Sequence, residues 1–511
     1  MSGNPHYFTR LNANAVSLFR HSAWAAAAAV TLTVARFALV AVVARRLSQA
    51  AFGQFAYAQW LVDTAFLACS LGATGVVARY LAEFRARPER LAAFMMRWRP
   101  FAFGLPVVTG GAVLLGAVFS DLGLDSVSLL ILALWALANG LWSMQTAALA
   151  GLQRFDLIFR ANGLAAAIMV TGALVLPLQS SSILLLFGLM GVACGAAATV
   201  GITVIKQLVG GAVESIEPDG WRSIRSYASN IWITALLWSV VWSRGELPIV
   251  RAYLGDAGVA QYAAAMTLFG GAVQGVMMAA SGVAPQLTML WGSGRLDEAK
   301  TTARAVMDVQ LLICGAGALL LICLGPDLVS LAFGSAYRQA AAPLSALAVG
   351  LLAMSVSSQN HVLQIATDAR FSRNTTLFGL VLLFGTAAVL TPLQGLTGAA
   401  IARAGTMLLL AVVSLVVVTR RWGASAITWR NVVIVSTVVV AAAVAVATDS
   451  GLSTISRVIL LGIGLVVLTV SMRDQHNRLL SFLLPKALVL RARTDQVALA
   501  YKKGPDTTGP K

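Results

Sequence analysis

The sequence predicts an all-α fold, a polytopic membrane protein with about 14 transmembrane helices. Of its 511 residues, 58% are hydrophobic and only 11% are charged, and the mean hydropathy is +0.81. Soluble proteins contain about 25% charged residues. Apolar runs of roughly 20 residues recur along the whole chain, and a run of that length crosses a hydrocarbon core of about 30 Å. Together these two observations exclude an ordinary soluble domain.

Hydropathy in windows of about 19 residues sets the limits of each span. The expected spans are 22–44, 53–78, 100–120, 127–150, 159–178, 182–205, 228–251, 258–282, 304–325, 341–362, 372–391, 396–418, 430–447 and 453–472. We expect an N-terminal segment (1–21), a six-helix bundle (22–205), a linker (206–227), a second six-helix bundle (228–418), two extra helices (430–472) and a basic tail (473–511).

The distribution of Lys and Arg predicts the orientation. Most of the 37 basic residues fall in alternate connections, above all in 79–99 and in the tail after residue 472. The opposite connections contain only Arg45, Arg46, Arg251, Arg338 and Arg457. By the positive-inside rule both termini are cytoplasmic. The net charge of +17 then reflects topology and contact with anionic lipid, and we expect no nucleic-acid partner.

Two stretches outside the expected spans, 78–100 and 477–493, mix Arg with Leu and Phe. This pattern is typical of helices that lie on the inner leaflet, although a helix that docks a partner protein is an alternative.

An internal repeat relates the two expected bundles. The stretch "LSQAAFGQFAYA" (47–58) aligns without a gap with "LGDAGVAQYAAA" (254–265), so that Gln54 matches Gln261 and Phe55 faces Tyr262. The two copies lie six spans apart, and an even number of spans preserves their orientation. Repeated halves around a central site are a common plan of transporters.

Three arginines, Arg36, Arg244 and Arg403, fall inside expected spans at similar depths. A lipid-facing arginine at the membrane centre costs roughly 2.5–3.5 kcal/mol on the insertion scale. We therefore expect these side chains to face a cavity or a partner. A ring of three guanidinium groups would bind a diphosphate, because each can donate two parallel hydrogen bonds to phosphate oxygens.

Two acidic residues inside the spans, Asp63 and Glu246, leave other interpretations open. They could pair with the arginines as static ties between helices, or they could bind a coupling proton or cation. Glu246 and Arg244 are two residues apart and point away from each other on a helix, so the partner of Glu246 must lie on another span.

The seventh span is interrupted at "SRGELP", residues 243–248. Pro248 has no N–H, so the carbonyl of Arg244 loses its helical partner, and Gly245 loosens the same turn. Irregular backbone at membrane depth is tolerated only against protein or a wet cavity. We expect a hinge here that lines a transport pathway.

The sequence contains no phosphate-loop motif and no cluster of metal ligands, so we expect no cofactor, no metal and no ATP hydrolysis. The four cysteines lie in apolar spans without paired spacing, and we interpret them as packing residues.

Three stretches resemble one known family. They are "RAYLGDAGVAQYAAA" (251–265), "LAFGSAYRQAAAPLSALAVG" (331–350) and "LQGLTGAAIARAGTMLL", which begins at Leu393. They are similar to the polysaccharide-exporter branch of the multidrug/oligosaccharidyl-lipid/polysaccharide (MOP) flippase superfamily. The resemblance implies a flippase, not an enzyme, in the bacterial inner membrane. Its implied substrate is a polyprenyl-phosphate-linked oligosaccharide for O-antigen, exopolysaccharide or capsule, and its implied partners are membrane lipids and a polysaccharide polymerase or export machinery.

Other functions stay open at this point. A cation-coupled multidrug exporter of the same superfamily would favour an acidic cavity, whereas the charge inside these spans is net basic. A membrane-embedded glycan polymerase or ligase would carry a large outer loop, and no outer loop here exceeds about 20 residues by the same hydropathy windows. A lipid II flippase is a further alternative.

Overall fold

The computed structural model describes residues 5–84, 88–177, 183–207, 218–279, 283–366, 370–422, 428–447 and 455–471. All regular elements in these ranges are helices, which confirms the all-α prediction. The first part forms α1 (Pro5–Arg46), α2 (Gln49–Cys69), α3 (Ala73–Phe84), α4 (Pro88–Phe119), α5 (Ser126–Gly151), α6 (Phe155–Val175) and α7 (Ile183–Gln207). The second part forms α8 (Pro218–Ser239), η1 (Val240–Arg244), α9 (Leu247–Ala279), α10 (Val283–Gly292), α11 (Leu296–Phe333), η2 (Ser335–Ala340), α12 (Ala341–Gly350), η3 (Leu351–Val356), α13 (Ser357–Ala366), α14 (Arg370–Trp422), α15 (Trp429–Ala447) and the helix Ile455–Ser471.

By length and composition, eight described helices can cross a membrane, or nine if α2 and α3, bent by 57°, form one span. The 53 residues of α14 would extend about 80 Å at 1.5 Å per residue, too far for one crossing. Gly395 breaks α14 with a φ of 60°, and Gly255 breaks α9 with a φ of 64°. Since positive φ strongly favours glycine, these two residues mark the turns between expected spans seven and eight and between spans eleven and twelve.

The described helices refine several expected boundaries. Helix α1 begins at Pro5 and continues to Arg46, and its apolar part, Ala23–Arg46, lies at the expected first span. The linker ends before 218, where α8 begins. The stretch 78–100 is not one helix on the leaflet surface. It divides between α3 and α4, whose apolar faces pack against Trp221 and Ile224 of α8. The tail 473–511, with the stretch 477–493, lies outside the described residues.

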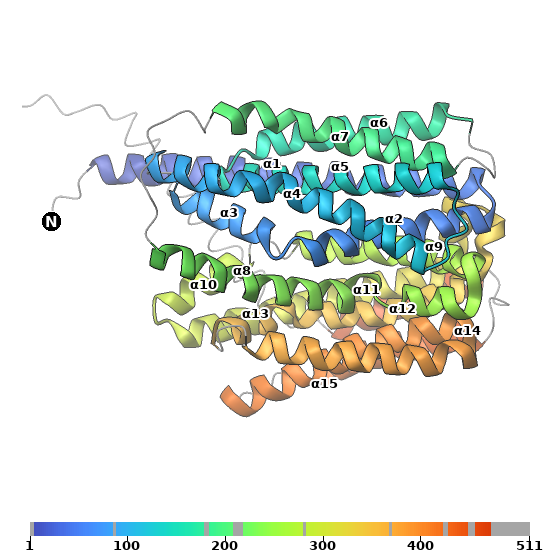
Figure 1. Cartoon of the computed structure of the whole chain (residues 1–511). Helices are drawn as coiled ribbons and strands as arrows, with labels where there is room; N and C mark the ends of the chain where they lie inside the picture. Colours follow the sequence, from blue (N-terminus) through green and yellow to red (C-terminus); the bar gives the residue numbers. More distant parts are fainter. Residues whose placement is uncertain are drawn as a thin grey trace, which may run out of the picture.

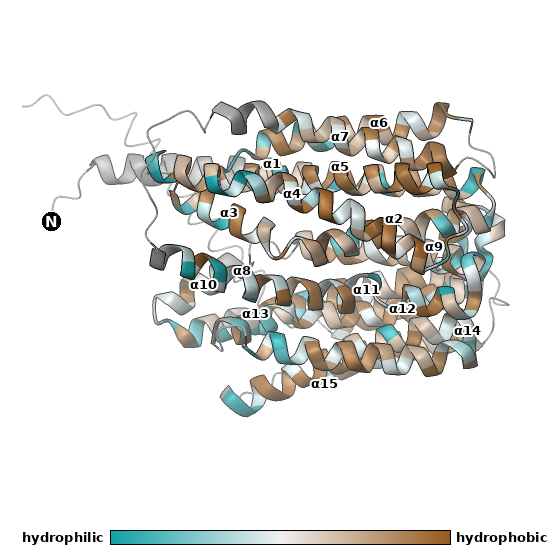
Figure 2. Cartoon of the chain, viewed as in Figure 1, coloured by the Kyte–Doolittle hydropathy of each residue, from teal (hydrophilic) through white to brown (hydrophobic). Residues whose placement is uncertain are grey.

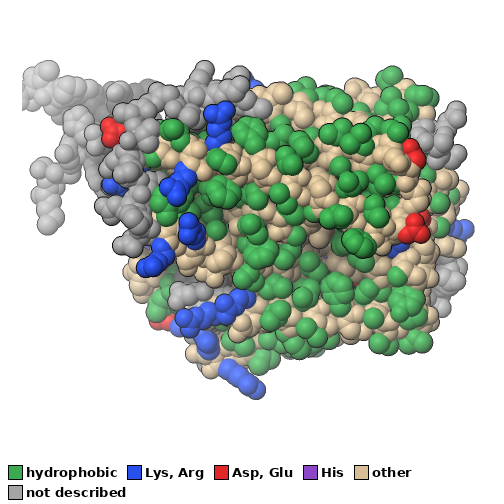
Figure 3. All heavy atoms as spheres, in the orientation of Figure 1, with side chains coloured by type: hydrophobic (Ala, Val, Ile, Leu, Met, Phe, Trp, Pro, Cys, Tyr) green, Lys and Arg blue, Asp and Glu red, His purple; other side chains and the backbone are tan. Residues whose placement is uncertain are grey.

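The helices run side by side and form two groups (Figure 1). Helices α1, α2 and α4–α7 contact one another, and so do α9, α11, α12, α14 and α15. Hydrophobic residues cover the middle of the bundle, whereas hydrophilic residues gather toward its two ends (Figure 2). On the face shown in Figure 3, most of the visible Lys and Arg side chains cluster at one end, whereas acidic side chains are visible at both ends. The chain is therefore a multi-span helical membrane protein with one basic end.

The repeated glutamines make equivalent contacts in the two groups. Gln54 Nε2 donates to the carbonyl of Leu122, just after α4, over 3.4 Å. Gln261 Nε2 donates to the carbonyl of Ala336, just after α11, over 2.8 Å. Because α4 and α11 follow their glutamines at corresponding places in the two halves, these bonds support the parallel repeat.

Side chains tie the two halves together at the end opposite the basic end. Arg45 of α1 donates through Nε to the carbonyl of Ala332 in α11 over 3.0 Å. Gln49 of α2 donates to the carbonyl of Ala336 over 2.6 Å. We call this the tied end. It comprises residues 45–53, 120–123, 251–258 and 331–340.

Arg251 of α9 makes a third tie at this end. It forms an ion pair with Asp256 at 2.8 Å, and its guanidinium lies 4.7 Å from the ring centre of Tyr57. The same side chain donates to the carbonyl of Asp121 over 3.0 Å, in the connection between α4 and α5. One arginine of the second half thus contacts α2 and the loop after α4.

Candidate functional site

The structure brings the five predicted charged residues into one cluster. Arg36 comes from α1, Asp63 from α2, Arg244 from the end of η1 and Glu246 from the turn before α9. Arg403 comes from the part of α14 after Gly395, which we call its second limb. Arg244 interacts electrostatically with all four other groups. Three cations and two anions leave the cluster with a formal charge of +1. The two halves of the chain both contribute, because Arg36 and Asp63 belong to the first and the other three residues to the second.

Arg403 and Glu246 form a buried ion pair. Arg403 Nη1 lies 2.8 and 3.0 Å from the two carboxylate oxygens of Glu246, and Tyr262 donates its hydroxyl to Glu246 Oε1 over 2.6 Å. Glu246 and Arg403 are 0% and 1% exposed. The expectation that Glu246 pairs with another span is confirmed. Arg403 is no open cation of a three-arginine ring, because a carboxylate at this depth requires its charge.

Tyr262 is a member of this pair's environment that sequence reasoning did not single out. It is 0% exposed, and its hydroxyl accounts for one of the hydrogen bonds that Glu246 accepts. The repeat alignment contained the signal, since the first half has Phe55 at the matching place and the second half has a tyrosine. Only the half that contains the buried glutamate has the additional hydroxyl.

The other three charged residues, Arg36, Arg244 and Asp63, are not part of this buried ion pair. Neither arginine forms a hydrogen bond or an ion pair with any residue that the structure describes, and the Nε of Arg36 is buried without a partner there. Asp63 is exposed although it lies in the middle of α2, interacts electrostatically with both arginines and has Asn139 of α5 as a hydrogen-bonding neighbour. A carboxylate within a spanning helix is expected to face water or other helices and not lipid.

The backbone is irregular at Arg244, as the sequence predicted. Residues 240–244 form a π-helix, and the N–H of Gly245 donates to the carbonyl of Val240 over 3.1 Å. A Cβ atom on Gly245 would lie 2.2 Å from that carbonyl oxygen, so only glycine fits this turn. The next α-helix begins at Leu247, with Pro248 in its first turn. Single π-helical turns are frequent at functional sites.

A polar cavity of about 330 Å³ borders this break within the second half. Trp242 of η1 lies in its wall, two residues before Arg244. None of its lining residues is Asp, Glu, Lys or Arg, and His361 is the one titratable side chain among them. Asn360 Oδ1 is buried without a hydrogen-bond partner among the described residues. The polar lining residues are Thr234, Gln310, Ser357, Asn360, His361, Gln364, Ser372, Thr375, Thr376 and Ser414.

Solved structures of similar architecture include multidrug transporters and a lipid flippase. An inward-facing multidrug resistance MATE-family transporter of the MOP superfamily has a TM-score of 0.63 at 14% identity, over 76% of this chain and 94% of the transporter. The lipid II flippase MurJ has a TM-score of 0.61 at 11% identity, over 89% of this chain and 98% of the flippase.

A MOP-superfamily transporter from Pyrococcus furiosus Vc1, described by the reverse polarity of its binding pocket, has a TM-score of 0.56 at 16% identity, over 81% of this chain and 96% of that protein. No protein-family model and no curated protein matches the sequence. At these identities the likeness shows the fold alone: the chain has the architecture of MOP-superfamily transporters.

Proposed function

We propose that this chain is a flippase that moves polyprenyl-(pyro)phosphate-linked oligosaccharide across the bacterial inner membrane by alternating access, for the synthesis of a surface polysaccharide. One observation supports it above all: Arg36 and Arg244, one from each half, lie together with no hydrogen bond or ion pair among the described residues. Two open guanidinium groups inside a membrane protein match the phosphate oxygens of a lipid carrier. A ligand held by one arginine from each half is also positioned to respond when the halves move.

A second observation supports a glycan: the polar cavity with Trp242 in its wall lies in the same half as Arg244, although Arg244 is not one of its lining residues. Hydroxyl and amide side chains can hydrogen-bond to sugar hydroxyls, and the rings of Trp242 and Phe371 offer apolar faces on which sugars stack. A lipophilic cation would find no carboxylate in this lining. The substrate class that matches both features is a phosphate joined to an uncharged glycan.

The membrane potential favours outward transport of such a substrate. With a negative cytoplasm, each phosphate charge that crosses the full potential gains about 2.3 kcal/mol per 100 mV. We place the tied end outside and the basic end in the cytoplasm, following the positive-inside pattern. The structure then corresponds to a state closed toward the outside, ready to take up substrate from the cytoplasmic side.

The test is depletion of the protein followed by measurement of lipid-linked glycan in the inner leaflet. We expect precursor to accumulate there while surface glycan falls. Arg36→Ala and Arg244→Ala should each reduce export about tenfold or more, because a lost charge-assisted hydrogen bond costs roughly 1.5–3 kcal/mol. Arg244→Lys should retain part of the activity, and Arg295→Ala at the exposed basic end is the matched control. Unchanged surface glycan and unchanged precursor on depletion would overturn the proposal.

A cation-coupled multidrug exporter is the second candidate, favoured by the exposed carboxylate of Asp63. Asp63→Asn separates the two functions. In an exporter coupled through this residue, the variant loses drug resistance in cells. In the flippase that we propose, the variant makes the arginine pair more positive and leaves drug sensitivity unchanged.

A further inference from the structure

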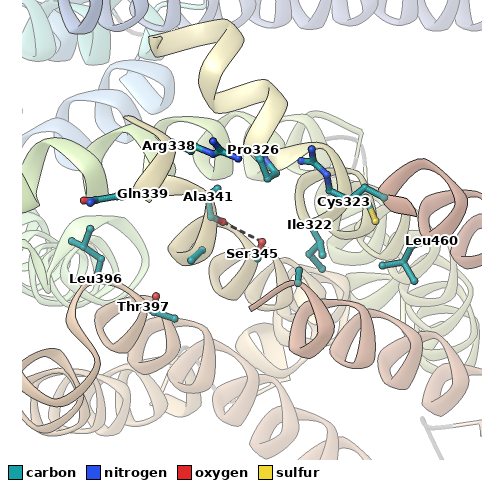
Figure 4. A pocket seen from close by; sticks show the side chains of 13 residues that line it. Ile322, Cys323, Pro326, Arg338, Gln339, Ala341, Ser345, Leu396, Thr397 and Leu460 are labelled. Carbon is teal, nitrogen blue, oxygen red and sulfur yellow. Dashed lines mark hydrogen bonds between the residues drawn. The ribbon is translucent and has the colours of Figure 1, made fainter. Parts of the chain in front are cut away.

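We propose that a separate cavity at the tied end of the second half binds the phosphate group of an anionic phospholipid. The cavity holds about 400 Å³ and lies among α11, α12, the second limb of α14, the end of α15 and the helix Ile455–Ser471. None of its lining residues belongs to the charged cluster around Arg244. Figure 4 shows its walls, with Arg338 directed toward Pro326 on one side and Leu460 beside Ile322 on the other.

Two arginines give the cavity its positive charge. Arg338 is exposed and forms no ion pair or hydrogen bond with the residues that the structure describes. Arg457 pairs with Asp327 of α11 at 3.3 Å. These two cations and one anion leave a charge of +1, which complements one phosphodiester. The guanidinium of Arg338 can bind two phosphate oxygens, and Arg457, already paired with Asp327, adds positive charge to the same wall.

The rest of the lining is divided between polar and apolar groups. Ser345 and Thr397 supply hydroxyl groups, and Gln339 supplies an amide. The remaining wall is apolar and includes Ile322, Pro326, Leu396 and Leu460. A free inorganic anion would leave this apolar wall uncovered. A phospholipid satisfies both parts, with its phosphate at the arginines and the start of an acyl chain along the wall.

The cavity also borders a helix that faces lipid. Arg457 and Leu460 lie on the helix Ile455–Ser471, which exposes a row of large apolar side chains: Ile455, Val458, Ile459, Ile463, Val466 and Val470. One side of this helix therefore contacts the hydrocarbon while another lines the cavity. A lipid needs no path through the protein to reach the arginines, and the tied end places its phosphate at the level of one leaflet's headgroups.

The experiment uses phosphatidylglycerol with a photoreactive acyl chain and the full-length protein reconstituted in phosphatidylcholine vesicles. Labelled peptides are identified by mass spectrometry. We expect labelling of peptides that contain residues 338–345 or 457–460. Arg338→Glu should reduce that labelling at least fivefold, and Arg338→Gln should reduce it less. Both variants change an exposed side chain without partners, so the fold is retained. Arg370→Glu, an exposed arginine of the basic end, is the matched control and should leave this labelling unchanged.

Two competition arms identify the source of the phosphate. Excess unlabelled phosphatidylglycerol should abolish labelling of these peptides, whereas inorganic phosphate at the same concentration should leave it intact. Equal labelling of wild type and Arg338→Glu would overturn the site. Competition by inorganic phosphate as strong as that by the lipid would overturn its assignment to a phospholipid.

Discussion

At the scale of single residues, burial separates the membrane arginines into two chemical kinds. Arg403 is 1% exposed and bound to Glu246, so its charge is neutralised and holds α14 against the turn before α9. Arg36 and Arg244 are half-buried, form no hydrogen bond or ion pair with a described residue, and share the exposed carboxylate of Asp63 as an electrostatic neighbour. The first kind stabilises the helix arrangement, whereas the second kind can bind a ligand.

The buried pair yields a stability prediction. Glu246→Gln leaves the Arg403 charge buried without a counterion, and breaking such a pair costs roughly 3–5 kcal/mol. We expect a large drop in the thermal unfolding temperature of the purified protein. The double variant Glu246→Gln/Arg403→Gln removes both charges and should recover most of that loss. Equal destabilisation in the single and double variants would show that the pair is not a charge interaction that stabilises the fold.

The sequence predicted which charged residues lie inside the helix bundle better than it predicted how they pair. Arg36, Asp63, Arg244, Glu246 and Arg403 were identified because each is expensive in hydrocarbon. Their pairing depends on which helix faces pack against each other, and hydropathy does not predict this packing. Only the structure shows that Glu246 forms its ion pair with Arg403 and not with Arg244.

At the scale of elements, the break between η1 and α9 is set by local chemistry. Glycine and proline at 245 and 248 predicted it, and a π-helical turn followed by a new helix is what the structure shows. The limits of other helices were harder to predict. Helix α14 continues through Pro392 and turns only at Gly395, which has the positive φ. Hydropathy placed this break between residues 391 and 396 but could not identify Gly395 as the residue that turns.

Gly245→Ala tests whether transport requires the backbone geometry of the turn between η1 and α9. The added Cβ would lie 2.2 Å from the backbone oxygen of Val240, so the turn must move and displace Arg244. We expect glycan export to fall about tenfold or more, in line with a barrier change of at least ~1.4 kcal/mol. Gly271→Ala in α9 is the matched control, because a Cβ there meets no atom within 4 Å. If both variants export equally, the backbone at Gly245 has no role in transport.

At the scale of the whole molecule, the two halves are closest where α2 crosses α9. A Cβ on Gly53 would lie 1.8 Å from the backbone oxygen of Asp256, so Gly53→Ala must push the two helices apart. We expect the variant to shift the population toward states open at the tied end. Spin labels at Ser335 in the tied end and at Ser126, three residues after its 120–123 stretch, are both exposed and should report a longer distance than in the parent protein. Gly111→Ala, which meets no atom within 4 Å, should leave that distance unchanged.

Orientation is the property that links charge distribution to the direction of transport. The basic end should be cytoplasmic and the tied end outside, since positive loops are retained on the cytoplasmic side. Arg295 lies exposed near the start of α11 and Ser335 lies exposed at the tied end, so each can report its side of the membrane. The measurement uses a variant in which the four native cysteines, all free thiols, are replaced.

In that background, Ser335→Cys should react with a membrane-impermeant maleimide in intact spheroplasts. Arg295→Cys should react only after the membrane is lysed. The reversed pattern would place the basic end outside and would contradict outward movement of phosphate down the membrane potential. Reaction of both cysteines before lysis would mean leaky spheroplasts, which an impermeant label on a cytoplasmic protein detects independently. The expected pattern would place the tied end, which the cross-half hydrogen bonds hold together, on the outer side, so that substrate reaches the arginine pair from the cytoplasmic side.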